Sequence, residues 1–493
     1  MPSDHPVRFI NAFVESLDLS SLGFEVGHAP TGRPRYSAQL LLSVYLYCYF
    51  DRIRTLRRME RACLENVAVM WLTGNVHPDH NTLWRFFQDN KVAIRNVLKQ
   101  SVKVATDANL IGMVLHAVDG TKIEAQASRK NAYYRKKLKQ ALHRVDASIT
   151  QMEKLLETSE EIGIDSYRLP EDLVDAEHCR EKIRKSLAEL DEAGTDNLQP
   201  SEPDARMMEC NGKLAFSYNA QAVTDDKAGI IVAGDVVTEE NDHGLLVPMI
   251  DMVKETAGDV AETTLADTGY SAAKDLAQAE EKGYEVLVNL GKNVDPAEGG
   301  KPFHTSRFVY DSEEDCCICP LGNKLRFRGT KNARRGDGKL KVYHCAGYKQ
   351  CPKRWQCSSS KRGRTIELSE HHESVARQRA KQRDEGVKAK LARRGVIVEP
   401  TFAFAKHGLE FRCWSYRYLE ANRSQWALIC STVNLHKLYA QWLKGTVALG
   451  KTAHARASSR VFGRLCSLIT AIRLFSGRIG ERHSRLLHLE YPL

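Results

Sequence analysis

The chain lacks a hydrophobic run long enough to cross a membrane. Its longest mostly apolar stretch, residues 40–50, is too short to span a bilayer and contains a serine and several tyrosines. The first residues, Met-Pro-Ser-Asp-His-Pro-Val-Arg, also lack the apolar segment of a signal peptide. We therefore expect a cytoplasmic protein that has no membrane partner.

Neither sign of charge is in large excess. The 493 residues include 72 Lys and Arg against 62 Asp and Glu, a formal net charge of +10. This balance suits a polyanionic partner but is far from a histone-like excess, and mildly basic proteins often bind no polyanion. The length exceeds one ordinary hydrophobic core and indicates two to four modules.

Three acidic residues occupy positions that suit metal-assisted phosphoryl transfer. Asp119 closes the apolar run 113–118 and reads as the last residue of a strand. Asp267 follows a short buried strand, residues 263–266, where the chain turns into a helix. Glu399 precedes Pro400, which suits the first turn of a helix. Each also fits an ordinary role, as a solvated turn, a helix cap or a surface residue near a helix N-terminus.

The chemistry explains why carboxylates would be gathered. Two Mg²⁺ ions about 4 Å apart can activate a water or a 3′-hydroxyl and stabilise the leaving oxygen at phosphorus. Magnesium takes oxygen ligands and needs few protein carboxylates. The three acids are far apart in sequence, so only a fold that brings strand ends together can unite them.

The sequence around these acids resembles the DDE transposases of bacterial insertion sequences, which have an RNase H-like catalytic domain. The matching segments in the N-terminal part are residues 32–42, 54–63 and 71–86. In the catalytic part they are Val-Asp-Gly-Thr-Lys-Ile-Glu-Ala (118–125), Pro-Asp-Ala-Arg (203–206), Tyr-Asn-Ala-Gln (218–221), Ala-Asp-Thr-Gly-Tyr (266–270) and Val-Glu-Pro-Thr-Phe (398–402). The resemblance implies that Asp119, Asp267 and Glu399 bind Mg²⁺ or Mn²⁺. It also implies a homo-oligomer acting on DNA at the bacterial nucleoid.

The sequence departs from this family at one point. Related transposases often carry Tyr-x2-Arg-x3-Glu-x6-Lys around the last acid, and here only Glu399 and Lys406 are present. Gly395 stands where the arginine would be, and Arg394 lies one residue out of register. Arg394 either contacts a phosphate near the cut or is an ordinary solvated charge. Lys406 has its role only from the resemblance.

The predicted fold is α+β and multidomain, with an RNase H-like mixed sheet flanked by helices. Residues 1–100 form an N-terminal helical DNA-binding domain and 110–440 the catalytic domain, followed by a basic tail, 441–493. Within the catalytic domain, a four-and-three spacing of apolar residues predicts a helical-hairpin insertion at 130–200. Segments 217–223 and 229–237 predict a β-hairpin, and 263–266 and 285–290 predict parallel strands.

Cysteines are concentrated in a second insertion, residues 305–360, which holds six of the thirteen. Four of them are candidate ligands of a structural zinc ion: Cys319, Cys345, Cys351 and Cys357. The spacing lacks the repeated Cys-x2-Cys pair of strong zinc motifs, so reduced cysteines in a small subdomain are an equal reading. The basic residues around them suit a DNA-backbone contact or a solvated surface.

Candidate DNA contacts occur in the N-terminal domain as well. Arg54, Arg57 and Arg58 belong to an arginine cluster that is either a DNA-binding face or a solvated helix. Residues 82–87 read as the entry to a recognition-type helix. Trp414 and Tyr416 fit core packing better than base stacking.

These features predict a DNA transposase that cuts at the ends of its element and joins them to target DNA. A nuclease of the same fold that cuts without joining is one alternative. A non-catalytic DNA-binding relic is the other, and the presence of all three acids argues against it.

Overall fold

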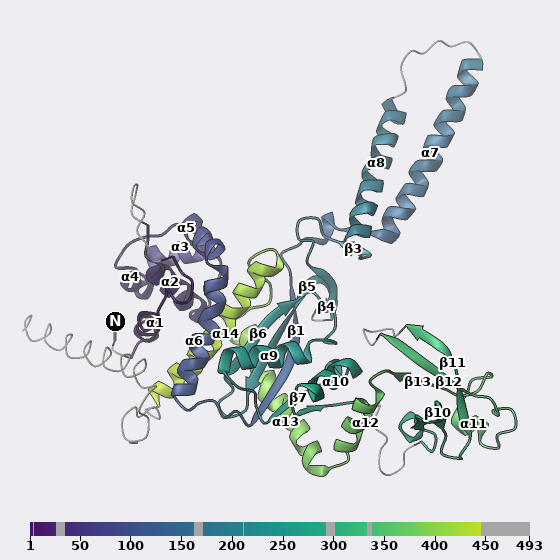
Figure 1. Cartoon of the computed structure of the whole chain (residues 1–493). Helices are drawn as coiled ribbons and strands as arrows, with labels where there is room; N and C mark the ends of the chain where they lie inside the picture. Colours follow the sequence, from purple (N-terminus) through teal and green to yellow (C-terminus); the bar gives the residue numbers. More distant parts are fainter. Residues whose placement is uncertain are drawn as a thin grey trace, which may run out of the picture.

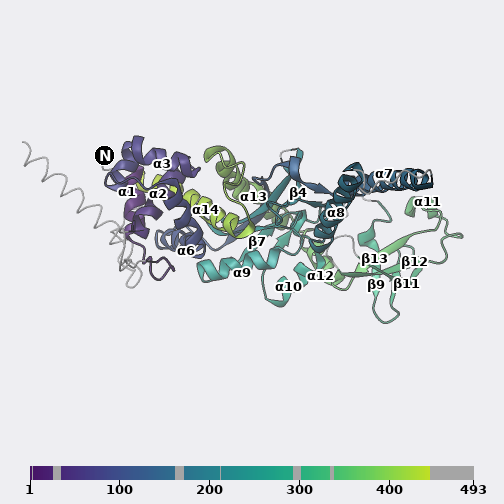
Figure 2. The ribbon, with the colours of Figure 1, turned by 90° about the horizontal axis from the view of Figure 1, so that it is seen from above.

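The computed structural model describes residues 1–2, 4–25, 35–161, 171–210, 212–291, 301–332 and 338–444. The basic tail after residue 444, together with Arg334 and Arg335 of the Cys-rich insertion, lies outside these residues. The N-terminal helices form one end of the molecule and the largest sheet its middle (Figures 1 and 2). A helical hairpin and a second sheet form the other end.

The N-terminal part is entirely helical where it is described. Its helices are α1 (Pro6–Glu15), α2 (Ala38–Phe50), α3 (Leu56–Glu65), α4 (Val67–Thr73), α5 (His80–Asp89) and α6 (Lys91–Asp107). Side-chain caps fix several helix starts: Ser37 accepts from the Leu40 amide, Asn66 from Ala68 and Asp79 from Thr82. Helix α2 is buried along most of its length, so the other helices pack around it.

The central part of the chain is built on a six-stranded mixed sheet. Its strands are β1 (Leu115–Glu124), β4 (Arg206–Cys210), β5 (Lys213–Asp225), β6 (Ile231–Val237), β7 (Thr263–Ala266) and β8 (Val286–Val288). Strand β5 pairs antiparallel with β1 on one edge and with β4 and β6 on the other. Strands β1, β7 and β8 are parallel. The mixed sheet, the β5–β6 hairpin and the parallel strands confirm the predicted fold class.

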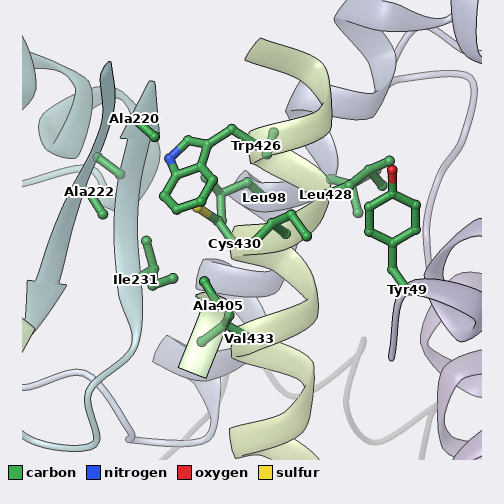
Figure 3. Packing of buried hydrophobic residues seen from close by; sticks show 14 of the residues in the cluster. Tyr49, Leu98, Ala220, Ala222, Ile231, Ala405, Trp426, Leu428, Cys430 and Val433 are labelled. Carbon is green, nitrogen blue, oxygen red and sulfur yellow. The ribbon is translucent and has the colours of Figure 1, made fainter. Parts of the chain in front are cut away.

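Helices cover this sheet and connect it to the N-terminal part. They are α9 (Leu246–Ala257), α10 (Ala273–Glu281), α12 (His372–Lys381), α13 (Glu385–Ala403) and α14 (Leu419–Leu443). Helix α14 lies between the sheet and α2: Trp426, Cys430 and Val433 face β5 and β6, whereas Leu428 faces Tyr49 (Figure 3). Trp414 and Tyr416, just before α14, are buried, which confirms their prediction as core residues.

Two insertions extend from the sheet. The predicted helical hairpin consists of α7 (Arg135–Glu161) and α8 (Glu171–Glu192), and the short strands β2 (Tyr133–Tyr134) and β3 (Asn197–Leu198) pair at its base. There Arg135 bonds to Asp191 and Asp196, one on α8 and one just after it. The hairpin points away from the sheet (Figure 1).

The Cys-rich insertion is a small antiparallel sheet in the order β13-β12-β11-β10-β9. Its elements are β9 (Val309–Asp311), β10 (Cys316–Ile318), β11 (Lys324–Asn332), β12 (Lys339–Cys345), α11 (Arg354–Cys357) and β13 (Thr365–Ser369). Helix α12 follows it and caps the β8 edge, where the side chains of Gln378 and Gln382 donate to the carbonyls of Val286 and Val288.

Short helical turns complete the description: η1 (Arg129–Asn131), η2 (Thr268–Tyr270), η4 (Thr305–Arg307) and the π-helical turn η5 (Phe404–Gly408). Among the helices of the described segments, none is both long and apolar enough to cross a membrane.

One buried side chain joins the sheet to the helices. The Asn434 amide of α14 accepts from the Ile231 N–H at 2.8 Å and donates to the Ile231 carbonyl at 2.9 Å and to Ser101 of α6 at 3.1 Å. We predict that Asn434→Leu lowers the free energy of unfolding by about 2–4 kcal/mol, because buried backbone groups lose their partner. Denaturant unfolding followed by tryptophan fluorescence measures this loss.

Ser431→Ala is the matched control. The Ser431 hydroxyl donates only to a carbonyl of its own helix, that of Ala427. Its loss should cost below about 1 kcal/mol. Equal losses in the two variants would contradict the bridging role of Asn434.

Candidate active site

Asp119 lies on β1, and Asp267 lies just after the end of the neighbouring parallel strand β7. In the register of β1 and β7, Ala117 is paired with Leu265. Each aspartate lies two residues beyond its member of this pair, so the two occupy corresponding positions. The prediction that Asp119 ends its strand is wrong. Strand β1 continues to Glu124 because β5 pairs with it along its whole length.

Local backbone bonds hold both carboxylates. Asp119 Oδ1 accepts from the Gly120 amide at 2.9 Å. Asp267 caps the turn η2, where its Oδ1 accepts from the Gly269 amide at 2.8 Å. This second bond confirms that the chain leaves a buried strand and enters a helical turn at Asp267.

Arg394 is the cation closest to these carboxylates among the described contacts. Its Nη1 lies 3.1 Å from Asp119 Oδ2, and both side chains are 19% exposed. Burial raises the pKa of Asp119 and the charge of Asp267 raises it further, whereas Arg394 and the Gly120 amide oppose the rise. Arg394 is therefore not a solvated surface charge, because it offsets the repulsion between two acids.

Glu399 lies on the same helix as Arg394 but on its flank. Helix α13 begins after the capping residue Asp384, so the prediction that Pro400 lies in the first turn is wrong: Pro400 is near the C-terminal end. The Glu399 carboxylate folds back over Gly395, where an added Cβ would meet Oε1 at 2.7 Å. In the described structure Glu399 is exposed and makes no hydrogen bond or ion pair with either aspartate.

Lys406 lies in the π-helical turn η5 that follows α13. Burial lowers the pKa of Lys406, and the nearby Cys210 thiol at the end of β4 opposes that shift. The side chain is thus directed to the β4 edge of the sheet. The structure brings together Asp119, Asp267 and Arg394, with Glu399 and Lys406 further along the same helical segment.

Asp242 was not singled out from the sequence. Its Oδ1 accepts from Asn219 at 2.7 Å, Gln221 at 2.8 Å and Lys122 at 3.3 Å. The motif Tyr-Asn-Ala-Gln (218–221) could have indicated a polar cluster here, because Asn219 and Gln221 are two residues apart and so lie on the same face of β5. What the sequence did not show is that the loop after β6 brings an acid to them.

Asp242 lies against the backbone next to both aspartates. A Cβ at Gly120 would meet Asp242 Oδ1 and Asn219 Oδ1 at 2.8 Å and come closer still to the Gln221 amide nitrogen. A Cβ at Gly269 would lie 3.0 Å from Asp242 Oδ2. Glycine at these positions allows the polar cluster to approach the segments that carry Asp119 and Asp267.

The other predicted site residues lie away from this centre. The Arg54 guanidinium lies 5.7 Å from the Phe411 ring centroid, and partial burial lowers its pKa. Arg57 and Arg58 are exposed on α3. Cys319, Cys345, Cys351 and Cys357 all belong to the Cys-rich sheet and its loops. Within the described ranges, no three His, Cys, Asp or Glu side chains are arranged to hold a metal ion as they stand.

Two family models match the chain. A model described as a transposase DDE domain matches residues 318–439, a range that includes Arg394, Glu399 and Lys406. A model described as a transposase domain (DUF772) matches residues 1–89, which include α1 to α5 and the arginine cluster. Neither range includes Asp119 or Asp267. No curated protein matches the chain significantly.

Gly120 gives a test of the packing beneath the two aspartates. We predict that Gly120→Ala lowers the free energy of unfolding by about 1–3 kcal/mol, because the new methyl must displace buried polar groups. Thermal and denaturant unfolding measure it. Gly347→Ala is the control, since nothing lies within 4 Å of a Cβ there, and its change should stay within about 0.5 kcal/mol. If Gly120→Ala leaves the free energy of unfolding unchanged, the polar groups around Gly120 move aside without cost, and the predicted packing constraint does not exist.

Proposed function

We propose that the chain, which its two transposase family matches identify as a DNA transposase, cleaves DNA at the ends of its element, and that the freed 3′-hydroxyl then attacks a phosphodiester of the target DNA. The observation that carries this mechanism is the pairing of Asp119 and Asp267 at the junction of β1 and β7. Helix α13 packs across these strands and carries Glu399.

The donor set fits Mg²⁺ or Mn²⁺ in its chemistry. Asp119 and Asp267 are adjacent carboxylates whose mutual repulsion a divalent cation would relieve. We assign them, with Glu399 as the third ligand, to the metal site. Bound Mg²⁺ would activate the attacking oxygen and stabilise the leaving one. Glu399 is exposed, so its carboxylate is free to turn from Gly395 toward the aspartates.

Arg394 has two roles in this proposal. Without DNA, its guanidinium neutralises Asp119 and keeps two neighbouring acids compatible with burial. With DNA bound, the same planar donor group suits a phosphate oxygen next to the scissile bond. Movement from carboxylate to phosphate would clear Asp119 Oδ2 as the substrate arrives.

Asp242 acts as a positioning residue in the proposed site. It gathers the side chains of Lys122, Asn219 and Gln221 beneath Gly120 and Gly269. Gln221 also accepts a hydrogen bond from the buried Tyr270 hydroxyl, at the end of the Asp267 turn. This network ties the two aspartate segments to one scaffold, which a site that must hold carboxylates in fixed positions requires.

The N-terminal helices are the proposed reader of the element's ends. On α5, Trp84 is 49% exposed and Asn81 and Arg85 are exposed near it, while Leu83 and Phe87 are buried. This is the face that a recognition helix presents to a groove. Arg57 and Arg58 on α3 would contact phosphates beside it. Because both ends must be cut, we expect a homo-oligomer on DNA.

The metal-site assignment is tested with Asp267→Asn and Glu399→Gln on DNA that carries the element's ends. Each variant should lose at least about 100-fold in both cleavage and joining, because several kcal/mol of transition-state stabilisation depend on the metal. Gel analysis of cut and joined products at fixed Mg²⁺ measures both steps. Glu385→Gln, at the exposed start of the same helix, should keep wild-type rates.

The wild-type products separate the alternatives. Joined products support the transposase mechanism, whereas cleavage without joining identifies a nuclease of this fold. Binding of the ends without any cleavage would leave a DNA-binding relic and end the catalytic assignment.

The dual role of Arg394 is tested against its neighbour Arg393. Arg393 makes an ion pair with Asp226 at 2.6 Å and is exposed. We predict that Arg394→Ala slows cleavage about 10- to 100-fold through the lost phosphate contact, and that Arg393→Ala changes it less than about twofold. Arg394→Ala should also lower the Mg²⁺ concentration needed for half-maximal rate, because the competing guanidinium is gone. An unchanged rate with an unchanged Mg²⁺ dependence would refute both roles.

A further inference from the structure

The Cys-rich sheet has a very small hydrophobic core. Five residues form its buried cluster: Cys317, Leu325, Tyr343, Cys345 and Ile366. The chain between β12 and β13 contains only the four-residue helix α11, and Trp355 on that helix is 71% exposed. Modules of this size rarely gain enough free energy from apolar burial alone and often need disulfides or a metal. None of the described cysteines forms a disulfide.

Four cysteines from separate elements gather at this poorly packed end. Cys319 follows β10, Cys345 ends β12, and Cys351 and Cys357 lie before and at the end of α11. Cys345 belongs to the buried cluster of the sheet, and Cys319 packs against that cluster. The Cys345 amide donates to the Arg364 carbonyl at 3.1 Å, and the Arg364 guanidinium donates to the Cys357 carbonyl at 3.5 Å. Arg364 thus joins the strand end that carries Cys345 to the helix that carries Cys357.

Cys319 sits in a turn that directs a backbone amide at its sulfur. The Leu321 amide donates to Cys319 Sγ at 3.4 Å, and the turn closes with a 2.8 Å bond from the Gly322 amide to the Cys319 carbonyl. Amide donors directed at sulfur favour the thiolate, which is the form that binds a metal.

The remaining cysteines of the insertion are placed differently. Cys316 and Cys317 lie within β10, where they pair with Arg326 and Leu325 of β11, and both are buried. Cys316 and Cys317 therefore belong to the strand and its core. This leaves four of the six cysteines as candidate metal ligands. We propose that Cys319, Cys345, Cys351 and Cys357 bind one structural Zn²⁺ ion through their four sulfur atoms.

The chemistry of this donor set is that of a closed zinc site. Four thiolates complete a tetrahedron and leave no position for substrate, so the ion would stabilise the fold and take no part in DNA cleavage. The sulfur atoms do not yet converge on one point in the described structure. Binding therefore requires the side chains on the loop and α11 to turn inward, and would fasten residues 346–364 to the sheet.

The proposed zinc site would also affect the neighbouring elements, because the Cys-rich sheet lies in the chain between β8 and the helices α12 and α13. In the described structure Lys324, Lys331 and Lys341 form ion pairs with acidic neighbours, whereas Arg326 and Arg328 of β11 are exposed. These two arginines could therefore contact a DNA backbone, and a zinc-bound loop would hold the sheet that carries them in place. Zinc would thus hold a basic surface beside the catalytic sheet.

The first measurement is the zinc content of the full chain, purified under reducing conditions without chelator, by elemental mass spectrometry. We expect one Zn²⁺ per chain in the wild type and in Cys179→Ser, which changes an exposed cysteine of the helical hairpin. Cys351→Ser and Cys357→Ser should each retain less than about a tenth of it. Cys351→His should keep most of it, because histidine replaces cysteine in many zinc sites.

Cobalt substitution separates binding from misfolding. Metal-free wild type should take up Co²⁺ with sulfur-to-metal charge-transfer bands, and these bands should weaken in Cys357→Ser while circular dichroism shows the helices intact. Absence of zinc and of Co²⁺ uptake in the wild type would overturn the proposal, as would equal zinc in all cysteine variants. Asp267→Asn should keep its zinc, so this result stands apart from the catalytic assignment.

Discussion

The parallel pairing of β1 with β7 is the constraint on which the proposed active site depends. It is the point where the antiparallel half of the sheet meets the parallel half, and it places Asp119 beside Asp267 across a single strand spacing. Two partly buried acids on adjacent chain segments repel each other, and a nearby cation relieves this repulsion. Arg394 supplies this cation in the described structure, and a bound metal would do so during catalysis. Helix α13 carries Arg394 to this point because it packs across β1 and β7.

Helix α14 connects the central sheet to the N-terminal helices. It contacts the sheet through Trp426, whose indole donates to the Gln221 carbonyl at 2.8 Å, and α2 through Gln425, whose amide donates to the Tyr49 hydroxyl at 2.8 Å. Ser424 adds a bond to the Lys91 carbonyl at the start of α6. Buried polar bonds on both sides of α14 are costly to break, so they join the two parts firmly. The surface of α5 that we propose to read the DNA ends is thereby joined to the sheet that carries the aspartates.

Local patterns in the sequence predicted the elements that depend on neighbours in the chain. Alternation and turn residues located the β5–β6 hairpin, and apolar spacing located α7 and α8. Partners distant in sequence decided the rest. Asp119 lies inside its strand because β5 extends the pairing to Glu124, and Pro400 lies inside a helix whose start depends on the Asp384 cap. Nothing near Asp242 in sequence indicates that it meets Gly120 and Gly269. The acids themselves were identified by resemblance, since an isolated aspartate after an apolar run is common.

The displacement of the arginine by one residue has a physical explanation in the helix. One residue corresponds to about 100° around the helix axis, so positions 394 and 395 face different surroundings. Arg394 lies on the stripe of Ile397, Val398 and Thr401 that packs on the sheet, and there it reaches Asp119. Position 395 lies on the Glu399 side, where any side chain would collide with that carboxylate as it now lies. Arg394 thus faces Asp119, and Gly395 leaves the space that the Glu399 carboxylate occupies in the described structure.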